Sequence, residues 1–264
     1  MPVRLLIKAI TLPNFLRRVI KYSPMKTPAD ARQHPNRAEF IAGSLNELPL
    51  LLGVFPFGMI YGVLATQALM PVAAAQGMSA IVFAGSAQFL STQLIAQDAP
   101  SLVLIGTIFI INLRHALYSA SLLPYTRHLS LKWKALLAYF LTDEAYVVAI
   151  AHYDDPETSL ERKHWYFLGA GVTLWAGWQL STAAGIFLGA QVPAAWSLDF
   201  ALALTFIALV VPALKDRPAV AAAVTAGLIA LVTYALPYKL WLLAAAFGGI
   251  LAGLACEELC KRSG

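Results

Sequence analysis

Long apolar runs, separated by short polar connections, occupy most of the chain after residue 47. A helix needs about 20 apolar residues to cross the hydrocarbon core of a bilayer, so this pattern predicts eight transmembrane helices, or seven if the second run re-enters the membrane. The predicted fold class is all-α, a polytopic transmembrane helical bundle. The predicted spans are Leu48–Met70, Met78–Ala96, Ser101–Leu123, Ala135–Ile150, Tyr166–Ala190, Leu198–Leu214, Ala219–Leu236 and Lys239–Cys256.

The two ends of the chain are more polar than the region between them. Residues 1–47 carry eight of the nineteen Lys and Arg residues. Within Val3–Ile20, apolar and basic positions alternate, which is typical of a basic helix lying on an anionic membrane surface. We expect the remainder to be a flexible cytoplasmic tail, in which Met25 is an alternative start of translation. The transmembrane region is then 48–256, and 257–264 form a short cytoplasmic tail.

The distribution of basic residues favours a cytoplasmic N-terminus, because this orientation places most Lys and Arg residues inside. One connection is an exception, since Arg127, Lys132 and Lys134 lie outside in an eight-helix topology. A broken or re-entrant Met78–Ala96 segment would bring this connection inside, but it would also invert every later connection.

Composition supports a membrane protein and narrows the chemistry. The chain is 59% hydrophobic and 12% charged, against about 45–50% and 25% in soluble domains. Its basic residues are not interleaved with aromatic residues, so no nucleic-acid surface is predicted. Cys256 and Cys260 stand near the end of the last span without a neighbouring His, so we expect neither a disulfide framework nor a metal site, and no cofactor.

A cationic residue interrupts the third apolar run. Asn112, Arg114, His115 and Tyr118 lie in its second half. An arginine near the bilayer centre costs at least about 2.5–3.5 kcal/mol, so it normally faces a partner or a watery cavity. In a helix, Arg114, Tyr118 and Ser121 share one stripe at i, i+4 and i+7.

Two other segments contain polar residues at a comparable depth. Ser86 and Gln88 lie in the second run, and Asp143 and Glu144 lie in the fourth. We predict that the three segments converge on a polar pathway. Ser86 and Gln88 are suited to contact a zwitterion, although hydrogen bonding between helices is an equally open interpretation, worth about 0.6 kcal/mol for each bond.

The charged residues have both functional and structural interpretations. Arg114 either snorkels toward the interface or holds an anionic group, which is a substrate carboxylate or Asp143 when the pathway is empty. Adjacent helical residues point about 100° apart, so only one of Asp143 and Glu144 faces the same cavity. Asp143 is the preferred charge partner or proton carrier. His115 relays a proton or, as is commoner for a buried histidine, bonds a backbone carbonyl.

The first run contains Pro56 between Gly53 and Gly58. This pattern predicts a kinked or unwound helix, and such breaks often line the substrate sites of transporters. Pro56 and Gly58 are therefore candidates for substrate contact. Tyr166–Ala190 is similarly rich in glycine, and the pairing suggests an internal repeat that residue similarity is too weak to establish.

Four motifs carry a family resemblance over roughly residues 45–190. They are GVFPFGMIYG at Gly53–Gly62, GSAQF at Gly85–Phe89, NLRHALYSASL at Asn112–Leu122 and TDEAY at Thr142–Tyr146. In order and spacing they resemble the AzlC/YgaZ family, the large subunits of branched-chain amino acid exporters. The resemblance implies export of leucine, valine, isoleucine and analogues across a bacterial inner membrane, together with a small AzlD-like membrane subunit.

Other functional classes are less well supported. The sequence contains no nucleotide-binding P-loop, so energy for transport would come from an ion gradient or a partner. A membrane enzyme is disfavoured, because GxSG and HExxH motifs and a pair of membrane aspartates are absent. The alternative function is a transporter or channel for another small polar solute.

Overall fold

The computed structural model describes residues 35–153, 162–189, 214 and 216–262. Every element within these residues is a helix, which confirms the all-α class. Three of them are long and apolar enough to cross a membrane: α3 (Pro35–Gln67), α6 (Ser101–Thr126) and α12 (Leu240–Arg262). Of the predicted tail, residues 35–47 belong to α3 instead, and residues 1–34 lie outside the described part. The same is true of 198–213 in the sixth predicted span.

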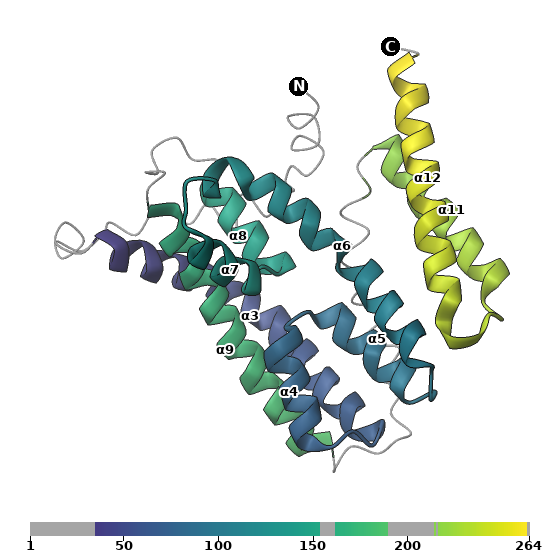
Figure 1. The fold of residues 1–264 in the computed structure, drawn as a ribbon, viewed down its shortest axis with the longest axis horizontal. Helices are drawn as coiled ribbons and strands as arrows, with labels where there is room; N and C mark the ends of the chain where they lie inside the picture. The colour runs from purple at the N-terminus through teal and green to yellow at the C-terminus, as the bar shows by residue number, and fades with distance from the viewer. Residues whose placement is uncertain (1–34, 154–161, 190–213, 215, 263–264) are drawn as a thin grey trace. The chain divides into compact units, whose positions relative to one another are not determined.

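The chain divides into two compact units, Met1–Phe89 with Ile111–Val192, and Leu90–Ile110 with Pro193–Gly264. In the first unit, α3 and α9 (Lys163–Gly189) lie side by side along their length (Figure 1). They run parallel, because Gly43 lies against Tyr166 whereas Gly62 lies against Ile186. The glycine-rich segments that suggested a repeat are therefore direct packing partners.

Glycine is required where these two helices approach most closely. A Cβ on Gly185 would stand 2.1 Å from the carbonyl oxygen of Met59, and one on Gly43 would stand 2.0 Å from that of Tyr166. In lipid, association of helices depends on such close packing, because the surrounding hydrocarbon is as apolar as the helices themselves. Their glycines thus allow α3 and α9 to form the central pair of this unit.

Two of the predicted spans are broken helices. The second run forms α4 (Val72–Val82) and α5 (Gly85–Ile95), and Phe83 between them is left-handed with φ 43°. The fourth run forms α7 (Leu131–Tyr139) and α8 (Asp143–Tyr153). Neither run is a single continuous helix, so this part of the sequence prediction is wrong. The break that the sequence offered as an alternative for Met78–Ala96 is present.

The α7–α8 segment starts and finishes at the same end of the unit. At its start, the ring of Trp133 lies 4.6 Å from that of His164, which is near the beginning of α9. At its finish, the Tyr153 hydroxyl donates to the backbone carbonyl of Lys163, also at the beginning of α9. The segment therefore forms a hairpin that turns back at residues 140–142.

This arrangement changes the predicted topology. The last turn of α6 meets the beginning of α9, because Lys163 lies over the Tyr125 ring. Hence α6 runs opposite to the parallel helices α3 and α9, and α7–α8 adds no crossing. We expect α4–α5 to return as well, since α3 and α6 run in opposite directions. With a cytoplasmic N-terminus, Lys132 and Arg162 then lie on the same side, and the charge exception disappears.

The second unit contains a helical hairpin. Helices α11 (Arg217–Thr233) and α12 pack against each other and are joined through η4 (Pro237–Lys239) (Figure 1). They are antiparallel, because Gly253 lies against Pro218 and Ala222 whereas Gly248 lies against Ile229. Asp216 caps α11 by accepting a hydrogen bond from the Ala219 amide at 2.8 Å. Small residues again allow close contact between the two helices.

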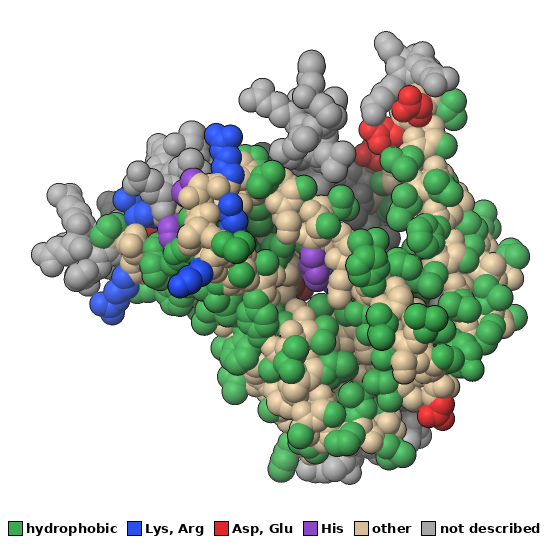
Figure 2. All heavy atoms as spheres, viewed as in Figure 1, with side chains coloured by type: hydrophobic (Ala, Val, Ile, Leu, Met, Phe, Trp, Pro, Cys, Tyr) green, Lys and Arg blue, Asp and Glu red, His purple; other side chains and the backbone are tan. Residues whose placement is uncertain are grey.

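Hydrophobic side chains cover most of the face of the molecule seen in Figure 2, and many large ones are exposed on the helices. Leu52, Leu102 and Val232 are each more than four-fifths exposed. Soluble proteins rarely present so much continuous apolar surface, whereas a bilayer covers it. The surface therefore agrees with membrane insertion.

The hairpin topology predicts the accessibility of two loop positions. Single cysteines introduced by Lys132→Cys and Arg162→Cys, after Cys256 and Cys260 are replaced by serine, should react with a membrane-impermeant maleimide from the same side of the membrane. Labelling of intact cells and of inside-out vesicles measures this, and the cytoplasmic side is expected from the positive charges. Labelling from opposite sides would disprove the α7–α8 hairpin.

Close packing between α3 and α9 predicts a matched pair of stability effects. Gly185→Ala should lower the free energy of unfolding by about 1–3 kcal/mol, because its new methyl group overlaps the α3 backbone. Gly53→Ala is the control, since no atom lies within 4 Å of its Cβ position. Thermal unfolding in detergent measures both, and equal effects would contradict the proposed packing.

Candidate functional site

A single arginine links the two broken segments. From the middle of α6, Arg114 Nη1 donates to Asp143 Oδ2 at 2.5 Å, and Nη2 donates to Ser86 Oγ at 2.7 Å. Ser86 lies in the first turn of α5, and Asp143 is the first residue of α8. The structure thus brings together three predicted site residues from three separate segments.

A second contact extends the site along α6. The Tyr118 hydroxyl donates to Asp143 Oδ1 at 2.7 Å, so both oxygens of this carboxylate are engaged. The Tyr118 ring stacks on Tyr146 with 4.5 Å between the ring centres. Tyr146 and Ser121 share a hydrogen bond of 2.9 Å between their hydroxyl groups. Arg114, Tyr118 and Ser121 therefore all face α8, as their helical spacing predicts.

Local sequence explains why Asp143 stands at the start of a helix. The Thr142 hydroxyl accepts a hydrogen bond from the Ala145 amide at 3.3 Å, which is an N-cap interaction. A carboxylate in the first turn is favoured by the partial positive charge at the helix N-terminus. The same end effect at α5, together with Arg114, makes this region attractive to anions.

The two points of interruption lie close together. Phe83, at the end of α4, has its ring 6.1 Å from that of Tyr139, at the end of α7. The Tyr139 hydroxyl donates to the Ala80 carbonyl and accepts a hydrogen bond from Trp175 Nε1 at 2.7 Å. A side chain thus bonds one backbone carbonyl near the α4–α5 break, and such partners are what the membrane interior requires.

The ion pair remains partly accessible. The side chains of Arg114 and Asp143 are 29% and 41% exposed, respectively. In addition, Arg114 Nε and Asn112 Oδ1 are buried and have no hydrogen-bond partner among the described residues. Since buried polar atoms are normally paired, these two atoms are available to water or to a ligand.

The remaining predicted residues lie around this centre. Gln88 is fully buried and its Oε1 accepts a hydrogen bond from Trp178 Nε1 at 3.1 Å, which holds α5 against α9. The His115 ring lies 6.0 Å from the Tyr118 ring, and its buried Nε2 makes no hydrogen bond within the described structure. Glu144 bonds Thr142 and is close enough to Glu47 for their charges to interact.

The proline in α3 does not break the helix. α3 continues through both Pro49 and Pro56, so the predicted unwound turn is absent. Pro56 is exposed, and Gly58 is buried where a Cβ would stand 1.8 Å from Ser181 Oγ of α9. The structure thus places Gly58 in helix packing. Its neighbours provide enough support to keep a helix continuous despite the hydrogen bond lost at a proline.

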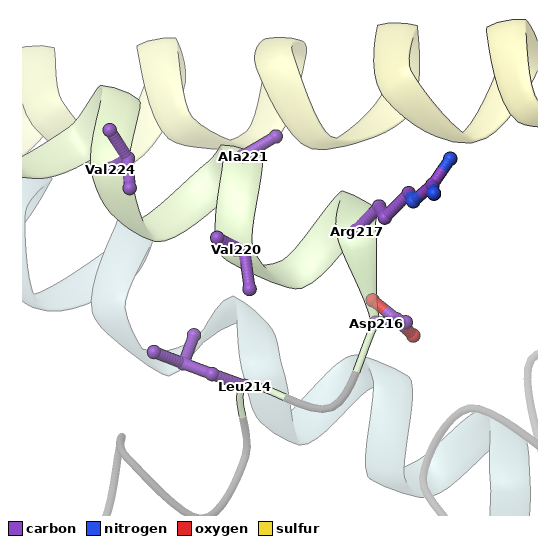
Figure 3. A pocket seen from close by; sticks show the side chains of 6 residues that line it. All are labelled: Leu214, Asp216, Arg217, Val220, Ala221 and Val224. Atoms are coloured by element: carbon purple, nitrogen blue, oxygen red, sulfur yellow. The ribbon is translucent and has the colours of Figure 1, made fainter.

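A separate hollow lies in the second unit, at the beginning of α11. It is lined by Leu214, Asp216, Arg217, Val220, Ala221 and Val224 (Figure 3). Asp216 is already used as the helix cap, and most of the other lining side chains are apolar. This hollow contains none of the predicted site residues.

Sequence reasoning missed several members of the site. Tyr146 lies within the TDEAY motif but was not assigned a role, and only its contact with Tyr118 reveals one. Trp178 is one of many aromatic residues in the apolar runs, and the sequence offers no signal that it holds Gln88. Glu47 stands directly before the first predicted span, where a carboxylate is expected to be solvated.

Comparisons with known proteins agree with this description. The family described as AzlC protein matches residues 49–192. The inner membrane protein YgaZ of Escherichia coli is 25% identical over 89% of this chain and 92% of its own length. An uncharacterized membrane protein of Archaeoglobus fulgidus is 30% identical over 80% of this chain and 93% of its own length. No solved structure matches the chain significantly.

The bridge predicts coupling between Arg114 and Asp143. In a double-mutant cycle of Arg114→Ala and Asp143→Ala, the two changes should be non-additive by about 1 kcal/mol or more, because each leaves the other's charge without its partner. Thermal unfolding in detergent provides the four stabilities. A matched cycle of Arg114→Ala with Glu39→Ala should be additive, because Glu39 contacts His152 and shares no partner with Arg114. Additivity in both cycles would mean that the ion pair contributes nothing to stability.

Proposed function

Because the chain belongs to the AzlC family of membrane proteins, we propose that it is a secondary transporter that exports branched-chain amino acids across the inner membrane. In this proposal it is the large subunit of a complex with a small AzlD-like membrane subunit. The observation that carries the proposal is the accessible Arg114–Asp143 pair between the first turns of two broken helices.

The charges of this pair suit an amino acid. The pair presents one cation and one anion, and a zwitterion offers the opposite charge to each of them. A substrate carboxylate would take the Nη1 position that Asp143 now occupies, next to the unpaired Nε of Arg114 and the N-terminus of α5. The substrate ammonium would then compensate the released Asp143 carboxylate, so no charge is left unpaired in a low-dielectric site.

The surroundings also offer apolar contact. Tyr118 and Tyr146 stack next to Asp143, and their ring faces give a surface for an aliphatic side chain. Aromatic residues provide large contact areas while their hydroxyl groups stay hydrogen-bonded. These features favour an amino acid with an apolar side chain. Selectivity among leucine, valine and isoleucine remains part of the proposal.

A channel or a transporter for another polar solute is the alternative. The broken helices support a transporter, because discontinuous helices whose N-termini face the substrate are a recurring feature of secondary transporters. A channel would not concentrate its solute, so concentrative uptake into inside-out vesicles separates the two. The sequence contains no P-loop, which agrees with transport driven by a gradient.

Transport should depend on both members of the ion pair. Efflux of labelled leucine, valine and isoleucine from cells that co-express an AzlD-like subunit should be lost in Arg114→Ala and Asp143→Asn, because each removes the group that receives one end of the zwitterion. Gly53→Ala, in the same region of the chain but with open space around it, is the control. Protein levels in the membrane are measured in parallel.

Two substrate analogues test the role of each charge of the substrate separately. In wild type, 4-methylpentanoate lacks the ammonium and isoamylamine lacks the carboxylate, so neither should compete with labelled leucine. Competition by isoamylamine alone would locate recognition at Asp143 only. Efflux that survives both substitutions would reject the ion pair as the substrate site.

A further inference from the structure

A second carboxyl group lies inside the first unit and is not used by the proposed substrate site. Glu47 of α3 is fully buried, at 0% exposure. Neither of its carboxyl oxygens accepts a hydrogen bond from any described residue. An ionised carboxylate is very costly in such surroundings, so a buried carboxyl without a partner keeps its proton. Glu47 is therefore a proton-carrying group in this conformation.

The groups that face Glu47 come from the helices packed against α3. Glu144 of α8 and Tyr166 of α9 are both close enough for charge interaction with it. Helix α4 contributes no titratable residue. Tyr166 is held in place by Asn46, whose Nδ2 donates to the tyrosine hydroxyl at 2.6 Å. No cation faces Glu47 among these groups, and Glu144 is the carboxyl group whose charge acts on it.

We propose that Glu47, acting with Glu144, binds the proton whose movement drives transport. This inference rests on the proposed function and names its coupling ion. Carboxyl groups inside membrane helices commonly serve as proton relays in transporters, because the cost of ionising them is released only when a compensating charge arrives. Here the substrate ammonium binds at Asp143, whose charge acts on the neighbouring Glu144.

The path from Glu47 to the substrate site is short. Glu144 follows Asp143 directly in α8, and its carboxyl group interacts with the charges of both Asp143 and Arg114. Protonation of the Glu47–Glu144 pair therefore changes the electrostatic potential at the ion pair that receives the zwitterion. Thermodynamic linkage requires the reverse as well, so substrate binding changes the affinity for the proton.

Polar groups also lead from Glu47 toward the beginning of α3. The His152 ring stacks on Tyr166 with 3.7 Å between the ring centres. His152 Nε2 lies 3.1 Å from Glu39 Oε2, and Glu39 lies two turns before Glu47 in α3. Glu39, His152 and Tyr166 thus lie between the beginning of α3 and the neighbourhood of Glu47, and none of them belongs to the proposed substrate site.

The sign of the coupling follows from these charges. The charge of Asp143 acts on Glu144 more strongly than that of Arg114, so the ammonium bound at Asp143 outweighs the substrate carboxylate bound at Arg114, favours the ionised carboxyl pair and releases the proton from Glu47 when substrate binds. When the substrate has left, the pair takes up a proton again. Proton and substrate thus bind in alternation, which is the requirement for their exchange in opposite directions.

Reconstituted vesicles test the proposal. The chain is co-purified with an AzlD-like subunit and reconstituted with a pH indicator inside the vesicles. Two activities are measured: counterflow exchange of labelled leucine, which needs no net proton movement, and the pH change driven by a leucine gradient. Glu47→Gln should retain exchange and lose the leucine-driven pH change, because the amide fills the same space but carries no transferable proton. Glu47→Asp should retain both activities.

A matched substitution in α12 serves as the control. Glu258→Gln makes the same chemical change there and should alter neither activity. Wild type that exchanges leucine without any pH change would overturn the proton coupling and leave the proposed function standing, as would Glu47→Gln that keeps a full pH change. Absence of leucine exchange in wild type would overturn the proposed function itself.

A chemical probe on wild type decides the case even if Glu47→Gln does not fold. Dicyclohexylcarbodiimide adds to protonated carboxylic acids in apolar surroundings, and mass spectrometry locates the adduct. Glu47 should be labelled, and an excess of leucine should reduce that labelling because the bound ammonium promotes ionisation. Labelling elsewhere but not at Glu47 would overturn its assignment as the proton-binding group, whatever the transport result.

Discussion

Interrupted backbone inside a membrane must be enclosed by protein, and this constraint accounts for the arrangement of the first unit. Water is absent from the bilayer core, so backbone groups freed at a helix break need partners within the molecule. The breaks at Phe83 and at residues 140–142 lie against each other and against α9, where Tyr139 bonds the Ala80 carbonyl and Trp175. The two breaks converge because both broken helices need the same neighbouring protein groups as partners.

The same convergence concentrates positive charge. Two helix N-termini point into a region that also contains the Arg114 guanidinium, and Asp143 alone among the residues hydrogen-bonded to Arg114 supplies a compensating negative charge. A cation in this position costs at least about 2.5–3.5 kcal/mol unless it is paired. Arg114 therefore stays attached to Asp143 until another anion is present. In the proposed function, a zwitterion would divide this pair without leaving either charge unpaired, because it offers the opposite charge to each member.

The unit combines one extended helix pair, α3 and α9, with two interrupted segments made of short helices. α3 and α9 touch along much of their length, and an added side chain at Gly43, Gly62 or Gly185 would overlap the backbone of the other helix. By contrast, α7 and α8 span only Leu131–Tyr139 and Asp143–Tyr153, and α4 is similarly short. The α3–α9 pair is closely packed, whereas the short helices are joined by side-chain bridges. This arrangement suits a mechanism in which the short segments move against a fixed scaffold made of α3 and α9. Glu47 lies on the scaffold side and Glu144 on the hairpin side, so such movement would change the environment of both carboxyl groups.

The sequence alone determined the helical class, the membrane location and the stripe of Arg114, Tyr118 and Ser121, since hydropathy and helical periodicity are local properties. It did not determine where helices break. In Met78–Ala96 no proline or charged residue marks the break at Phe83, and Pro56, the strongest local signal for a break, lies in a helix that its neighbours keep continuous. Burial of Glu47 also depended on the tertiary structure, because the residue borders a polar segment in sequence and becomes enclosed only when α8 and α9 pack against α3. The length of an apolar run reflects only the free energy of transferring that segment into lipid. Which polar groups come into contact is decided by how helices that are distant in the sequence pack together.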